Sequence, residues 1–163
     1  MNPGYFRIKL NKKEAIQRLC DWKGGIYKES IRTNYLNAVK VSIDQNGQWK
    51  GDCLYVYQNE DWTVFEDLSG FYSFIDPESW LEFAREDELV FVAYNDAMLY
   101  AEMIEFVDGT VVKYFLENFD IPEDNVNKGS GYAEIQSWID VANFMDHDEY
   151  YFDRSDQGMV LIF

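Results

Sequence analysis

Histidine, cysteine and proline are scarce in this chain, which has one, two and three of them among 163 residues. With one histidine, both cysteines would need the same partner for thiol catalysis, and neither sits in a recognisable catalytic context. Cys20 lies in a predicted helix and Cys53 at the head of a predicted strand, so both are expected to be buried free thiols. No serine occupies a G-x-S-x-G elbow. Nucleophilic catalysis is therefore disfavoured.

Long apolar runs are also missing. No segment approaches the roughly 20 apolar residues that a membrane-spanning helix needs. Residues 1–10 (MNPGYFRIKL) have neither the apolar core nor the cleavage site of a signal peptide. These two absences predict a cytoplasmic protein that does not associate with membranes.

Basic residues are few after position 50. The whole chain has 14 Lys plus Arg against 30 Asp plus Glu, a net charge of −16. Residues 1–50 carry ten basic and four acidic side chains (+6), and residues 51–163 carry four and twenty-six (−22). Such a field repels nucleic acid and anionic lipid and attracts basic partners. A second interpretation is internal: the basic first third lies across the acidic remainder.

Aromatic residues, by contrast, are abundant: twelve Tyr, twelve Phe and five Trp. A chain of this length and apolar content suits one domain, residues 1–163, with a sizeable core. Alternating apolar segments predict strands at residues 5–10, 36–44, 52–58, 62–68, 88–95, 97–106, 110–119 and 158–163. The fold class is α+β: a mainly antiparallel sheet of about six to eight strands, with a meander at its centre and two to three helices packed on it.

Three segments have helical periodicity: residues 12–22, 77–86 and 133–145. Asn11 is predicted to cap the first helix, and Gly24 to end it. Asp76 and Pro77 have the residue types favoured at a helix start. Asn46-Gly47 predicts a hairpin turn, and the polar segment 120–131 predicts a loop.

Candidate catalytic or metal-binding groups are weakly patterned. His147 is flanked by Asp146 and Asp148, but these acids lack the glycine and terminal glutamate offsets of a calcium loop. Two carboxylate pairs, Glu66-Asp67 and Glu102/Glu105, would need one member in an apolar pocket to act as an acid–base pair. We therefore expect no catalytic residue, no metal and no cofactor.

Acidic residues interleaved with aromatic ones form the most distinctive pattern. Carboxylates steer a basic partner towards a surface, and aromatic side chains supply desolvated anchors. The predicted partner-binding residues are Glu60, Asp61, Trp62, Glu66, Asp67, Asp146, Asp148, Glu149, Tyr150, Tyr151, Asp153 and Asp156. The predicted partner is a basic protein.

Residues 62–70 (WTVFEDLSG), residues 93–96 (AYND) and the Asp108-Gly109 hairpin resemble the small α+β families of bacterial immunity proteins. The resemblance implies a monomeric or homodimeric inhibitor that neutralises a toxin, such as a nuclease, delivered by a neighbouring cell. It assigns no functional residue. Two alternatives stay open: a small-ligand or regulatory binding domain, and a carboxylate- or metal-dependent enzyme.

Overall fold

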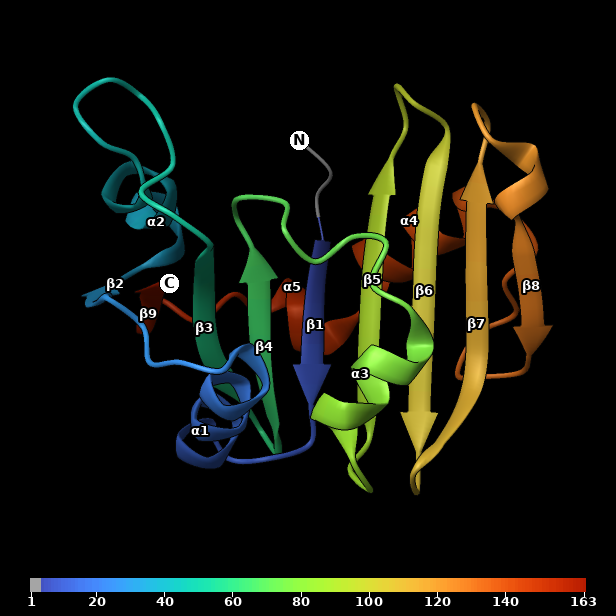
Figure 1. Cartoon of the computed structure of the whole chain (residues 1–163), viewed down its shortest axis with the longest axis horizontal. Helices are drawn as coiled ribbons and strands as arrows, with labels where there is room; N and C mark the ends of the chain where they lie inside the picture. Colours follow the sequence, from blue (N-terminus) through green and yellow to red (C-terminus); the bar gives the residue numbers. More distant parts are fainter. Residues whose placement is uncertain (1–3) are drawn as a thin grey trace.

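The computed structural model describes residues 4–163. Residues 1–3, which belong to the segment used to predict the absence of a signal peptide, lie outside the described part. The described chain forms one antiparallel sheet with the strand order β2-β9-β3-β4-β1-β5-β6-β7-β8 (Figure 1). Its strands are β1 (Gly4–Ile8), β2 (Glu29–Thr33), β3 (Cys53–Asn59), β4 (Trp62–Asp67), β5 (Leu89–Asn95), β6 (Tyr100–Val107), β7 (Thr110–Asn118), β8 (Val126–Gly129) and β9 (Gly158–Ile162).

Helices cover both faces of the sheet. On the front face of Figure 1, α1 (Lys12–Lys23) and α3 (Pro77–Ala84) pack over Phe6, Phe65 and Phe91. On the back face, α2 (Tyr35–Ser42), α4 (Trp138–His147) and α5 (Glu149–Phe152) pack over residues such as Tyr5 and Val64. A short 3₁₀ turn, η1 (Pro122–Asp124), precedes β8. No helix within residues 4–163 combines the length and apolar character needed to cross a membrane.

The predicted helix caps are confirmed. The Asn11 side chain accepts a hydrogen bond from the Glu14 amide at 3.0 Å, and Gly24 ends α1 with a φ of 75°. The Asp76 carboxylate accepts from the Ser79 amide at 2.8 Å, so α3 begins at Pro77 as its residue types indicate.

Local propensity misjudged three segments, one of which, the predicted loop 120–131, contains strand β8 paired with β7. The predicted strand 36–44 is wrong: it lies mostly in helix α2, capped by Asn34, whose side chain accepts from the Asn37 amide at 3.1 Å. Its buried residues, Ala38 and Ser42, are four apart, so a helix turns both towards the sheet. The third predicted helix begins later than expected, at Trp138, where Ser137 and Asp140 form a capping box.

The order of the strands was decided by long-range pairing. The predicted α+β class and antiparallel sheet are confirmed, and the meander of β5, β6 and β7 forms. It lies to one side of the sheet, because β1 pairs with β4 and β5 and so takes the middle position. Likewise β9 pairs with β2 and β3, one strand in from an edge. The first and last strands of the described chain, β1 and β9, are therefore each paired with two neighbouring strands.

Candidate functional site

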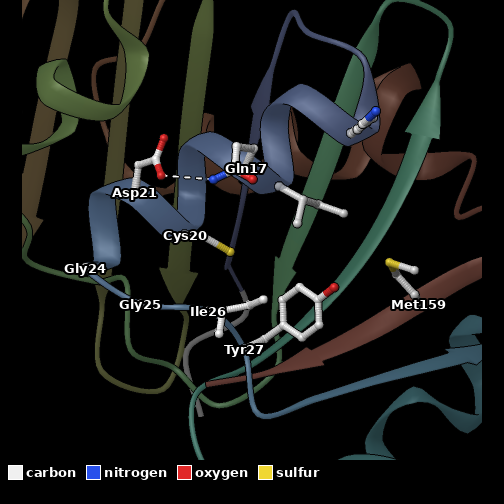
Figure 2. A pocket seen from close by; sticks show the side chains of 10 residues that line it. Gln17, Cys20, Asp21, Gly24, Gly25, Ile26, Tyr27 and Met159 are labelled. Carbon is white, nitrogen blue, oxygen red and sulfur yellow. Dashed lines mark hydrogen bonds between the residues drawn. The ribbon is translucent and has the colours of Figure 1, made fainter.

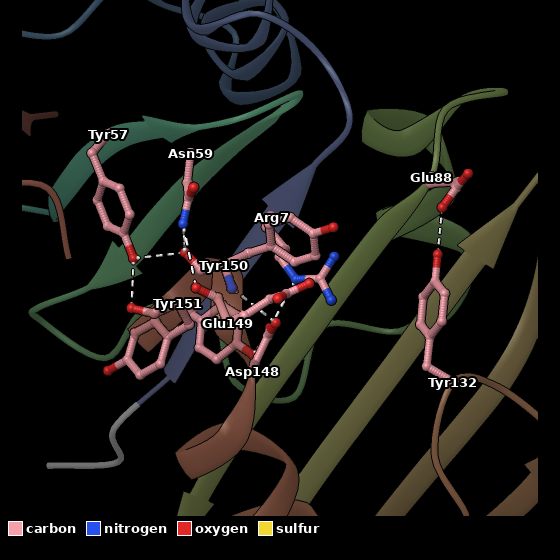
Figure 3. Close-up of polar contacts among 10 residues, drawn as sticks. Arg7, Tyr57, Asn59, Glu88, Tyr132, Asp148, Glu149, Tyr150 and Tyr151 are labelled. Atoms are coloured by element: carbon pink, nitrogen blue, oxygen red, sulfur yellow. Dashed lines mark hydrogen bonds and ion pairs between the residues drawn. The ribbon is translucent and has the colours of Figure 1, made fainter. Parts of the chain in front are cut away.

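The tip of the β3–β4 hairpin meets helix α5 at one corner of the molecule. The Asn59 side-chain amide donates to the backbone oxygens of Glu149 at 3.3 Å and Tyr150 at 3.2 Å (Figure 3). The exposed side chains of Glu60 and Asp61 follow Asn59 directly, and Glu149 is exposed as well. Two acidic segments about ninety residues apart in sequence therefore converge. We call Glu60, Asp61 and Glu149 the acidic rim.

The twelve predicted partner-binding residues divide by burial. Seven remain exposed or half-buried: Glu60, Asp61, Asp146, Glu149, Tyr150, Asp153 and Asp156. The expectation of a surface position is wrong for the other five, which are buried: Trp62, Glu66, Asp67, Asp148 and Tyr151. Their side chains face the sheet's own helices and loops, which a pattern of residue types does not reveal.

Glu66 and Asp67 have structural contacts on opposite faces of β4. On the back face, the Glu66 carboxylate accepts from the Tyr151 hydroxyl at 2.9 Å and lies 3.7 Å from Nε of Arg154. Burial raises the pKa of Glu66, and the Arg154 charge opposes that rise. On the front face, Asp67 accepts from the Gly70 amide at 2.7 Å and so holds the loop that follows β4. These two acids therefore contact other parts of the chain instead of facing solvent.

Asp148 is turned inward beneath the acidic rim. Its carboxylate accepts from the Tyr5 hydroxyl and from Nε of Arg7, the latter at 2.8 Å. The Arg7 guanidinium carbon lies 4.2 Å from the centre of the Trp62 ring and 4.8 Å from that of Tyr150. The guanidinium is thus tied at one edge to a carboxylate and contacts two aromatic rings.

Arg7 belongs to a row of charges that crosses four strands on the back face. In the sheet register, Arg7 is opposite Val90, Val90 is opposite Glu105, and Glu105 is opposite Lys113. Burial raises the pKa of Glu105, whose carboxylate accepts from the Tyr132 amide at 2.9 Å. Sequence reasoning missed Arg7 and Lys113 as interior residues. Their charges at strand positions that share a face with apolar neighbours were the available signal.

A pocket of about 490 Å³ lies beside Arg7. Trp62, Phe144, Tyr132 and Tyr150 supply aromatic parts of its lining, and Lys9, Glu88, Asp148 and Glu149 also border it. Lys9 and Glu88 form an ion pair at 3.3 Å, and the Tyr132 hydroxyl donates to Glu88 (Figure 3). The lining of the pocket therefore combines aromatic side chains with a few charged ones, which is typical of a small-molecule site.

Comparisons with known proteins found no relative. The chain matched no protein-family model, no curated protein and no solved structure. Fold and site chemistry are consequently the basis for the function proposed below.

The histidine motif does not assemble into a metal site. The Nδ1–H group of His147 donates to the Asn143 backbone oxygen at 2.8 Å, while Asp148 points inward to Arg7. Within residues 4–163, no three His, Cys, Asp or Glu side chains are grouped so that they could hold a metal ion. The His147 imidazole and the Asp148 carboxylate therefore bind different partners.

The two candidate acid–base pairs are also separated. Glu102 and Glu105 are three residues apart on β6, so they point to opposite faces of the sheet. Glu102 accepts from the Phe74 amide at 3.0 Å, and burial raises its pKa to about 7. Glu105 lies with Arg7 and Lys113 on the other face. Neither this pair nor Glu66-Asp67 shares a site.

A second hollow, of about 630 Å³, lies between α1, the loop that follows it and β9 (Figure 2). Cys20, Ile26, Tyr27 and Met159 form part of its lining. Its polar residues are already engaged in part, since the Gln17 side-chain amide donates to Asp21 at 3.0 Å. Lys13 and Asp21 also line this hollow, so its lining mixes polar and apolar side chains.

Four ion pairs join the basic first third to later acids. They are Arg7–Asp148, Lys9–Glu88, Arg18–Asp87 and Lys23–Asp52. The internal interpretation of the basic segment is thus correct for these residues, and the Arg18 pair at 2.6 Å helps to orient α1. The three acids of the acidic rim form no ion pair with any described residue.

Proposed function

We propose that this protein is a cytoplasmic immunity-type inhibitor that binds and neutralises a basic protein toxin, such as a nuclease. The observation that carries the proposal is the acidic rim, in which Glu60, Asp61 and Glu149 converge beside the half-buried ring of Tyr150 and have no ion-pair partner among residues 4–163. Asp146, Asp153 and Asp156 extend the exposed negative surface along the same C-terminal segment.

The charge distribution supports a role in association. A net charge of −16 raises the encounter rate with a cationic protein and discourages approach to nucleic acid. The rim acids steer the partner, and Tyr150 offers an aromatic anchor whose backbone is already fixed by Asn59. The backbone at Tyr150 therefore needs no rearrangement before the partner docks.

The direct test is co-expression with the protein encoded by the neighbouring gene. The wild-type chain is expected to restore growth and to co-purify with that neighbour. The triple variant Glu60→Lys, Asp61→Lys, Glu149→Lys is expected to lose protection and to associate more slowly. Association of the wild type is expected to slow in high salt, because salt screens exposed charges.

A matched control changes the net charge equally at a distant surface. Asp120, Glu123 and Asp124 are exposed near η1, so their triple replacement by lysine alters the total charge by the same amount. This control is expected to keep protection. Equal loss in both triple variants would refute the acidic rim as the contact surface. A harmless neighbour, together with no basic protein co-purifying, would refute the immunity function.

A further inference from the structure

The Arg7 guanidinium has unused hydrogen-bonding capacity in the interior. Arg7 is only 4 % exposed, yet within residues 4–163 its one hydrogen bond runs from Nε to Asp148. Nη1 is buried and has no partner. A buried charged donor without an acceptor is costly, because the lost hydration is not replaced. Such a group at the wall of a pocket indicates that an acceptor belongs there.

The guanidinium is also held in a fixed orientation. The Trp62 and Tyr150 rings lie within 5 Å of its carbon, and the bond from Nε to Asp148 sets its rotation. Figure 3 shows the two terminal nitrogens directed away from Asp148, towards the side on which Tyr132 and Glu88 lie. The Tyr132 ring centre is 5.9 Å from the guanidinium carbon. The two terminal nitrogens of the guanidinium therefore face the pocket.

The surrounding charges restrict which ligand could bind to the terminal nitrogens of Arg7. Lys9 is already paired with Glu88, and the carboxylates of Glu88, Asp148 and Glu149 line the same pocket. A doubly charged phosphate would be repelled by these acids more strongly than a singly charged group. A planar carboxylate matches the two parallel donors of a guanidinium, and the aromatic walls suit an organic body.

We propose that this pocket binds a small organic monocarboxylate, whose two oxygens accept from the terminal nitrogens of Arg7. Its apolar part lies among Trp62, Phe144 and Tyr132. Tyr132 is 55 % exposed, so the pocket is open to solvent on this side. This assignment does not depend on the proposed toxin partner.

Benzoate is the probe, with benzamide and inorganic phosphate as comparisons. Titration calorimetry on the purified full chain is expected to give a Kd on the order of 1 mM for benzoate. Benzamide has the same ring without the charge, and phosphate has charge without the ring, so both are expected to bind far more weakly. Equal binding of benzamide, or tighter binding of phosphate, would overturn the carboxylate assignment.

Arg7→Lys keeps the positive charge beside Asp148 but removes the fork, and is expected to weaken benzoate binding by about tenfold or more. Arg154→Lys is the matched control. Arg154 also lies on the back face, 4.2 Å from the centre of the Tyr35 ring, but does not line this pocket. The control is expected to bind benzoate like the wild type.

A second variant avoids the buried ion pair altogether. His147 is exposed at the mouth of the pocket, so His147→Trp is expected to fill the pocket, abolish benzoate binding and leave the fold intact. Ile139→Trp, at an exposed position of the same helix outside the pocket, is the control. The proposal fails if benzoate does not bind the wild type at millimolar concentration. It also fails if benzoate binds His147→Trp as tightly as the wild type.

Discussion

At the scale of single residues, buried acids set the response of this protein to pH. Glu102 is 1 % exposed on β6, and burial raises its pKa to about 7 from an ordinary value of 4.5. Between these two pH values the folded state keeps a proton that the unfolded chain has lost. The free energy of unfolding therefore falls as pH rises through that window.

Replacing Glu102 by glutamine is expected to stabilise the protein at pH 8, by on the order of 3 kcal/mol. Glutamine still accepts from the Phe74 amide and carries no charge to desolvate. Urea unfolding at pH 5 and pH 8 measures the effect, which is expected to be much smaller at pH 5, because the folded state still holds the proton there and the unfolded carboxyl has lost it only in part. A variant that is equally or less stable at pH 8 would contradict the assigned cause.

Gly131 is a second residue whose identity matters, because the chain passes close over Glu105. A Cβ atom at Gly131 would overlap the Glu105 carboxylate, which accepts from the next backbone amide at Tyr132. Gly131→Ala is expected to lower the free energy of unfolding by about 1–3 kcal/mol through this overlap.

Gly25 provides the comparison for that substitution. A Cβ atom there would meet nothing within 4 Å, so Gly25→Ala is expected to change stability by less than about 1 kcal/mol. Chemical denaturation of both variants separates steric overlap from the general effect of replacing glycine. Equal stabilities would show that the loop at Gly131 shifts freely.

At the scale of elements, capping residues predicted the positions of helices better than the helix and strand propensities of the residues did. Asn11, Gly24 and Asp76 locate the ends of α1 and α3 because each makes its contact within three or four residues of the chain. Val39, Val41 and Ile43 alternate along the segment of α2 and its C-cap, which favours a strand, but the helix is stabilised by packing against β9 and β3. Contacts with distant strands therefore overrode the local preference.

Asp76→Ala tests the cap of α3. The substitution removes the hydrogen bond to the Ser79 amide, and is expected to lower the melting temperature by roughly 2–4 °C. Glu82→Ala, at an exposed position of the same helix, controls for the loss of one negative charge. Equal melting temperatures for the two variants would mean that the cap does not contribute.

At the scale of the whole molecule, the net negative charge and the burial of acidic side chains both lower the free energy of unfolding as pH rises above 5. Burial raises the pKa of Glu66, Asp67, Glu102 and Glu105. Hydrogen bonds to backbone amides lower the pKa of the capping acids Asp76 and Asp140, whose stabilising effect is lost only below their ordinary value of 3.8. Net negative charge adds repulsion that grows with pH.

The melting temperature is therefore expected to be highest between about pH 4.5 and 6 and to fall towards pH 8. Added salt at pH 8 is expected to restore part of the loss, because it screens surface repulsion but not desolvation of buried acids. Calorimetric melting across pH and salt measures both effects. A stability that rises from pH 6 to pH 8 would refute this account.

The sequence by itself determined the α+β class, the caps, the meander and the unequal charge of the two parts of the chain. These features depend on contacts between near neighbours or on composition alone. Tertiary structure decided the central place of β1, the burial of Glu66, Asp67 and Asp148, and the convergence of Asn59 with Glu149. It also placed Arg7, Glu105 and Lys113 in one row, because strand register joins residues that are far apart in the chain.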